Sequence, residues 1–179
     1  MKWFIPFAVL AAPAVADQCP AGPNHSARIA EIILALNDAP SAQASRPLSQ
    51  ELWELWLDAP DAAAQDMLDQ GMAQREGADF LSARDTLDGL VEYCPNYAEG
   101  YNQRAFASFL RRDYAAALVD LDAALALMPN HIAALSGKGL TLMGLGRSEE
   151  GQDALRGALG LNPWLAERSL IAAPEGTDI

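Results

Sequence analysis

The stretch that decides the fold is YAEGYNQRAFASFLRRDYAAALVDLDAALALMP, Tyr97 to Pro129, because its spacing recurs before and after it. Three prolines, Pro95, Pro129 and Pro163, stand 34 residues apart. Shifting the chain by this period aligns small or apolar residues in further columns: Gly71, Ala105 and Gly139; Ala83, Ala117 and Gly151; Leu87, Leu121 and Leu155; Leu90, Ala124 and Ala158. One register accounts for every column, which indicates an internal repeat.

This repeat resembles the tetratricopeptide repeat family, whose pattern runs W-x2-L-G-x2-Y, then A-x3-F, then P. Three copies cover residues 64–97, 98–131 and 132–165. The resemblance implies an all-α fold, a right-handed α-solenoid of three helix pairs. The copies depart from the pattern just before the small residue, where Gln70, Arg104 and Lys138 replace the usual leucine. We expect their long stems to lie along apolar surface with the polar ends in water.

The pattern of apolar residues in each copy agrees with the resemblance. It predicts two amphipathic helices, and the small residue in the first helix lets the second approach closely. Neither helix buries its apolar face alone, so stacked neighbours must complete the core, and about three repeats are needed for stability. Asp79, Asp113 and Ser148 stand where the second helices should begin, and Asn96 with Glu99 has the form of a capping box.

The repeats are flanked by an N-terminal segment, 17–60, and a C-terminal segment, 166–179. Within the first, two helical faces predict a hairpin that closes the N-terminal end of the stack: Ile29, Ile32, Ile33 and Leu36, then Leu48, Leu52, Leu55 and Trp56. The residues between them, 37–47, should form a loop, and Trp53 and Trp56 should be buried against the first repeat. We expect 164–171 to form a short capping helix, followed by a mobile tail.

Residues 1–16 have the pattern of a secretory signal peptide, with Lys2 at the positive end, an apolar run and a small-residue cleavage site at Ala14-Val15-Ala16. The alternative, a membrane anchor, fits less well because the apolar run is short for a bilayer. We therefore expect an exported protein, periplasmic, with no membrane insertion after signal cleavage. Its position in a periplasm or outside the cell stays open.

The composition limits the partners. The chain carries 24 acidic and 12 basic residues, a net charge of −12. Nucleic acid and anionic lipid both require clustered lysine and arginine, so neither is expected as a partner. The densest acidic stretch, 61–92, is interpreted as a solvated face, with a basic partner as the alternative.

The two cysteines, Cys19 and Cys94, are an even count in a chain expected to be exported, which favours one disulfide. Such a bond would stabilise the fold by about 4 kcal/mol on the chain-entropy model. The alternative is two free or metal-binding thiols.

No catalytic, cofactor or metal-binding pattern is present, so we expect no enzyme. His25 and His131 are outside any metal-ligand spacing and are expected at the surface. No GxSxG, phosphate-loop or CxxC motif occurs. The glycines of 137–146 are interpreted as close helix packing.

A partner-binding function remains, and the resemblance implies where it would lie. In tetratricopeptide arrays the first helices line a concave groove, which here would include Leu68, Met72, Glu99, Asn102, Phe106, Leu140 and Met143. Some family members hold a partner's terminal carboxylate with lysines, an arginine and asparagines in this groove. Only Asn102 corresponds, because Leu68, Met72, Ala133 and Gly137 occupy the other positions. We therefore expect a protein or peptide partner with an apolar face.

Two alternatives remain open. The protein's own N-terminal hairpin or tail could fill the groove. The chain could also be a structural module that associates with itself as a homo-oligomer, rather than an adaptor or assembly factor of the bacterial cell envelope.

Overall fold

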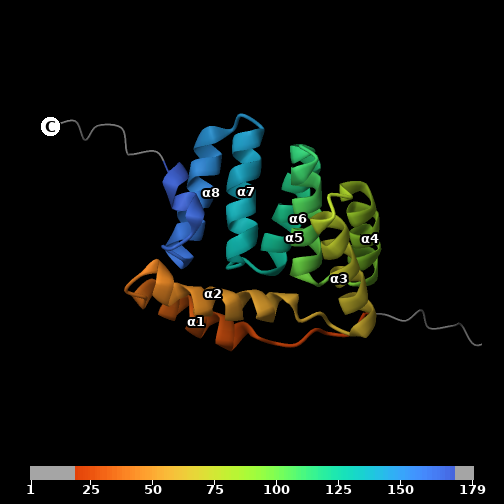
Figure 1. The fold of residues 1–179 in the computed structure, drawn as a ribbon, viewed down its shortest axis with the longest axis horizontal. Helices are drawn as coiled ribbons and strands as arrows, with labels where there is room; N and C mark the ends of the chain where they lie inside the picture. The colour runs from red at the N-terminus through yellow and green to blue at the C-terminus, as the bar shows by residue number, and fades with distance from the viewer. Residues whose placement is uncertain (1–18, 172–179) are drawn as a thin grey trace, which may run out of the picture.

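The computed structural model describes residues 19–171, and these residues form eight α-helices and one 3-10 helix (Figure 1). The elements are α1 (Ser26–Asp38), α2 (Ala42–Leu57), α3 (Ala62–Glu76), α4 (Phe80–Tyr93), α5 (Ala98–Leu110), α6 (Tyr114–Leu127), α7 (Ile132–Gly144), α8 (Ser148–Leu161) and η1 (Ala166–Leu170). The all-α solenoid is confirmed. The predicted signal peptide, 1–16, and the tail residues 172–179 lie outside the described residues.

Three helix pairs, α3 with α4, α5 with α6 and α7 with α8, stand side by side in an array (Figure 1). Asp61, Asp79 and Asp113 begin three of these helices, because each side chain accepts a hydrogen bond from a backbone N–H in the first turn. The other two expected caps are absent. Helix α8 begins at Ser148 without a side-chain cap, and Tyr97, not Asn96, precedes α5.

The small-residue column allows close packing within each pair. A Cβ on Gly71 would stand 2.7 Å from Leu87 Cγ, and a Cβ on Gly139 would stand 2.6 Å from Leu155 Cγ. Both leucines are buried in the core. In the middle pair Ala105 takes the same position and belongs to a buried cluster with Leu121. The aligned columns of the sequence are therefore contacts between paired helices.

The hairpin of α1 and α2 lies in a different place from the expected one. It runs across the lower ends of the repeat helices instead of closing the N-terminal end of the stack (Figure 1). Its buried side chains, among them Ile32 and Leu36, form one core cluster with Ile132 at the start of α7 and Ala158 near the end of α8. The side chain of Asn37 also donates to the Leu161 carbonyl, at 3.1 Å. The hairpin therefore packs on the third repeat.

The second hairpin helix begins earlier than predicted, at Ala42 rather than after Pro47. Ser41 caps it, with its hydroxyl accepting from the Ala44 N–H at 3.2 Å. Pro47 falls inside the helix and removes one backbone donor. The carbonyl that loses this donor belongs to Gln43, an exposed residue whose backbone can bond to water. The helix therefore tolerates the proline.

A disulfide joins Cys19 to Cys94, which directly follows α4. It connects the beginning of the described chain to the first repeat, while the hairpin that follows packs on the third. From Cys19 the chain runs along the lower edge of the array before entering α1 (Figure 1). The N-terminal segment is thus attached near both ends of the array.

The close approach of α7 and α8 gives a first prediction. Gly139→Ala should lower the free energy of unfolding by about 1–3 kcal/mol, because its Cβ would meet Leu155 and the Gly151 carbonyl oxygen, 3.0 Å away. Gly157→Ala is the matched control, since that exposed helical glycine has no atom within 4 Å of its added Cβ. The control should gain about 0.5–1 kcal/mol. Urea denaturation followed by circular dichroism measures both, and equal effects would contradict the packing described.

Candidate partner-binding groove

A groove of about 310 Å³ opens between α5 and α7. Of the seven residues predicted for partner binding, Asn102, Phe106 and Leu140 line it. Other positions of the same helices contribute Gln103, Phe109, Ala133 and Ser136. The expected concave face therefore contains a groove, centred on the second and third repeats.

The other four predicted residues do not line this groove. Leu68 is fully buried in the core of the first pair, and Glu99 is 1% exposed. Met72 packs against the first-pair core, and Met143 lies against α8 where Gly151 leaves room for it. The prediction of direct partner contact is therefore wrong for Leu68 and Glu99. Repeat register identifies the helix but does not show which of its faces is covered.

Phe106 is the most exposed aromatic side chain of the groove, at 44% of its surface. The guanidinium of Arg75 lies 4.6 Å from the centre of its ring, within the range of a cation–π contact. Burial lowers the pKa of Arg75, partly offset by the charges of Glu76 and Glu99. The Phe106 ring is thus in contact with Arg75 and is still partly exposed to solvent.

The groove wall also contains hydroxyl groups without partners. Ser136 and Thr141 are buried, and neither hydroxyl forms a hydrogen bond with a described residue. A buried unpaired hydroxyl costs about 1–3 kcal/mol.

Residues outside the repeat helices also line the groove. The repeat pattern alone did not indicate their contribution. Trp53 of α2 lines it, as do Leu165 and Glu167 at the C-terminal end. The hairpin therefore forms part of the groove wall. The sequence had left open whether the hairpin fills the groove, and the hairpin occupies it only at this edge. With these side chains in place, the groove still has a volume of about 310 Å³.

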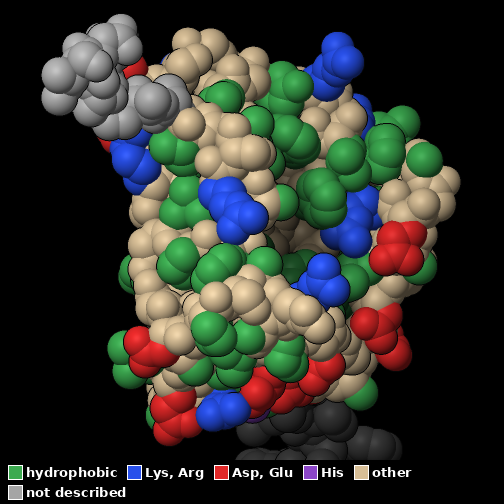
Figure 2. Space-filling model, turned by 60° about the vertical axis from the view of Figure 1, so that its left-hand side comes forward, with side chains coloured by type: hydrophobic (Ala, Val, Ile, Leu, Met, Phe, Trp, Pro, Cys, Tyr) green, Lys and Arg blue, Asp and Glu red, His purple; other side chains and the backbone are tan. Residues whose placement is uncertain are grey.

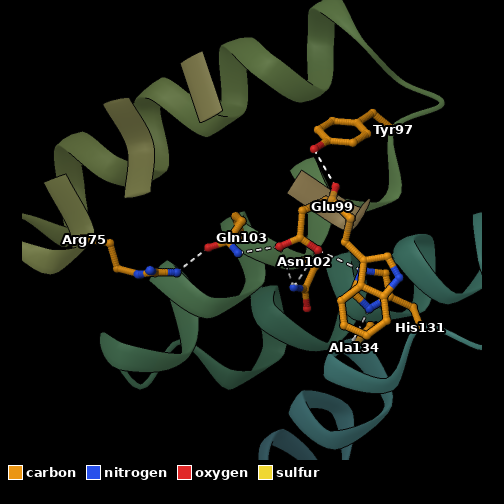
Figure 3. Close-up of polar contacts among 8 residues, drawn as sticks. Arg75, Tyr97, Glu99, Asn102, Gln103, His131 and Ala134 are labelled. Carbon is orange, nitrogen blue, oxygen red and sulfur yellow. Dashed lines mark hydrogen bonds and ion pairs between the residues drawn. The ribbon is translucent and has the colours of Figure 1, made fainter. Parts of the chain in front are cut away.

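Glu99 lies at the centre of a buried polar network that reaches the groove through Asn102 and Gln103 (Figure 3). Its carboxylate accepts hydrogen bonds from the side chains of Asn102, Gln103 and His131, the last at 2.8 Å from Nε2. Gln103 in turn accepts from Arg75. These bonds connect the end of α3, the first turns of α5 and the start of α7.

His131 is fully buried, so the expectation of a surface histidine is wrong. Its Nδ1 accepts from the Ala134 N–H at 3.3 Å and caps α7. Because this nitrogen is an acceptor, the ring hydrogen is on Nε2, which donates to Glu99. The imidazole ring of His131 also stacks on the ring of Trp56, with the two ring centres 4.2 Å apart.

Trp56 connects the network to the hairpin. It is buried against His131, at the boundary of the second and third repeats, and not against the first repeat as expected. Its carbonyl accepts from the Tyr97 hydroxyl at 2.8 Å (Figure 3). Burial raises the pKa of Tyr97, and the nearby charge of Glu99 adds to this, so the hydroxyl keeps its hydrogen for the bond.

The described residues provide no group of His, Cys, Asp or Glu that could hold a metal ion. His25 pairs with Asp58 at 2.7 Å, and His131 is occupied by its cap and by Glu99. In the same part of the chain no helix is long and apolar enough to cross a membrane.

The network gives a second prediction. Glu99→Ala should lower the free energy of unfolding by about 3 kcal/mol, because it leaves buried donors of three side chains without an acceptor. Asp66→Ala is the control, since Asp66 is exposed on α3 and bonds to no described residue. It should change the value by less than about 0.5 kcal/mol. Similar losses in the two variants, measured by urea denaturation, would contradict a structural role for the network.

The chain is similar to known proteins in part of its sequence. No protein-family model matches it. It is 40% identical over 65 residues to a tetratricopeptide repeat protein 36 homolog of Nematostella vectensis, covering 36% of each chain. It is 25% identical over 135 residues to a TPR repeat-containing protein of Rhizobium etli, covering 75% of this chain and 66% of that one. The chain thus spans about a third of the first relative and just under two thirds of the second.

Solved structures show the same fold. The first TPR domain of Spaghetti (RPAP3), bound to the HSP90 peptide SRMEEVD, has a TM-score of 0.58 at 23% identity, over 60% of this chain and 85% of that one. MamA from Desulfovibrio magneticus RS-1 has a TM-score of 0.53 at 20% identity, over 80% of this chain and 78% of that one. In its 34-residue repeat and its stacked helix pairs, the chain is similar to these tetratricopeptide repeat proteins.

Proposed function

We propose that the protein is a non-catalytic interaction module, an adaptor or assembly factor of the bacterial cell envelope. Its working surface is the groove between α5 and α7, which takes a peptide or helix with an apolar face. The observation that carries this proposal is the half-exposed Phe106 beside Leu140, in a groove whose walls also contain unpaired hydroxyls. Exposed large apolar side chains gathered in a groove are typical of interaction sites.

Neighbours in fold support the choice of a peptide partner. RPAP3 binds an HSP90 peptide, and the TPR2B domain of yeast Sti1 forms a complex with an Hsp70 peptide. This chain would not use the carboxylate clamp with which some tetratricopeptide repeat proteins hold the C-terminus of a partner. Asn102, the only corresponding residue, is 7% exposed and donates to Glu99. An apolar side chain of the partner would instead supply the main contact.

The envelope location has two supports. Residues 1–16 have the pattern of a secretory signal peptide. The disulfide between Cys19 and Cys94 belongs to an oxidising compartment, where such bonds form and persist. Both favour export to the periplasm.

The third prediction tests the groove by crosslinking capture from envelope extract. The baits are the wild-type chain, the double variant Phe106→Asp, Leu140→Asp, and Val119→Asp, which changes an exposed apolar residue of α6 outside the groove. One captured protein should be retained by the wild type and by Val119→Asp and lost only from the double variant, since two carboxylates would be desolvated against the partner. Circular dichroism confirms that all three baits keep their helices.

Identical captures by the three baits would contradict recognition in the groove. Sedimentation velocity over a range of concentrations separates a client from self-association. A monomer at high concentration is expected. A dimer that the double variant abolishes would instead favour the structural self-association module.

A further inference from the structure

A second hollow, which we call the arginine cleft, lies between α2, the start of α7 and η1 and has a volume of about 930 Å³. It adjoins the groove, because Trp53, Ala133 and Leu165 line both. On the face shown in Figure 2, hydrophobic and basic side chains surround a central hollow, while acidic side chains lie mainly along the lower part. A chain bound in the groove could therefore continue into the cleft.

The charge of the cleft is opposite to that of the protein. Arg46 and Arg168 are the charged residues among those described that line it, in a chain with a net charge of −12. Neither forms an ion pair with a described residue, and Arg168 only approaches the Trp164 ring, at 5.8 Å. Most arginines of the repeats are paired with acids, as Arg104 is with Asp88 and Asp120. The cleft thus offers two guanidinium groups to an anion.

Two indole groups of the cleft also lack partners. The Nε1 atoms of Trp56 and Trp164 are buried, and neither bonds to a described residue. Trp56 is 6% exposed as a whole. An indole N–H can only donate, so only an acceptor such as a carboxylate or a carbonyl oxygen can satisfy it. The unpaired donors and the unpaired cations favour the same kind of ligand, an oxygen anion.

We propose that the arginine cleft binds an acidic side chain of the same partner whose apolar side chain fills the groove. This inference rests on the proposed function and adds to it the chemistry of the partner, an apolar residue followed or preceded by an aspartate or glutamate. The arginines come from α2 and η1, outside the repeat helices. The flanking elements therefore provide selectivity, and the repeats provide the apolar contact.

The fourth prediction uses a randomised peptide library displayed on phage and selected against the full-length protein with its disulfide intact. The baits are the wild type, the double variant Arg46→Glu, Arg168→Glu, and the control Arg111→Glu, Arg112→Glu. The control makes the same charge change at two exposed arginines after α5 that line neither hollow. The groove variant Phe106→Asp, Leu140→Asp is the fourth bait.

Peptides selected by the wild type should carry an apolar residue and, at a constant spacing, an aspartate or glutamate. Their affinity should fall about tenfold or more for Arg46→Glu, Arg168→Glu and stay unchanged for the control, because charge-assisted hydrogen bonds to the acid are lost. Selection on the charge-reversed bait should instead enrich lysine or arginine at that spacing.

Three results would overturn the inference. Peptides that depend on Phe106 and Leu140 but show no acidic enrichment would remove the arginine cleft and leave the proposed function intact. Acidic peptides that bind both arginine double variants equally well would do the same. A selection without any peptide that depends on Phe106 and Leu140 would overturn the proposed function together with this inference.

Discussion

The buried carboxylate of Glu99 lies where the second repeat, the third repeat and the hairpin meet. A carboxylate without water is costly unless its oxygens accept hydrogen bonds, and here side chains of α5 and the capping histidine of α7 provide them. This fixes how the second repeat stands against the third. Because His131 also stacks on Trp56, the same contact holds the hairpin against the repeats. One acidic group thus joins three parts of the chain.

The position of the hairpin has a functional consequence. Trp53 stands in the groove wall, three residues before Trp56, so the contact that anchors the hairpin also holds Trp53 beside the groove. The arginine cleft exists for the same reason, since Arg46 lies on α2 and faces elements of the third repeat and η1 across the hollow. The hairpin and η1 thus contribute side chains to the walls of both the groove and the arginine cleft.

The sequence predicted the repeated part well and the hairpin's position badly. The column Gly71, Ala105 and Gly139 marks contacts between the two helices of each pair, which recur in every repeat, so periodicity alone reveals them. The apolar face of α1 shows that the helix must pack against another surface, but it does not identify that surface. In the structure the surface belongs to the third repeat. Glu99 was misread as a cap because its true partner, His131, lies 32 residues away, and no local pattern joins the two.

We expect the hairpin and the repeats to unfold as one cooperative body around Glu99 and His131. Native-state hydrogen exchange on the disulfide-bonded protein measures this cooperativity. We predict that amides of α1 near Ile32 and Leu36 open with nearly the same free energy as those of α7, and that Glu99→Ala lowers both together. Exchange of α1 that is much faster than that of α7, and insensitive to Glu99→Ala, would show that the hairpin unfolds separately from the repeats.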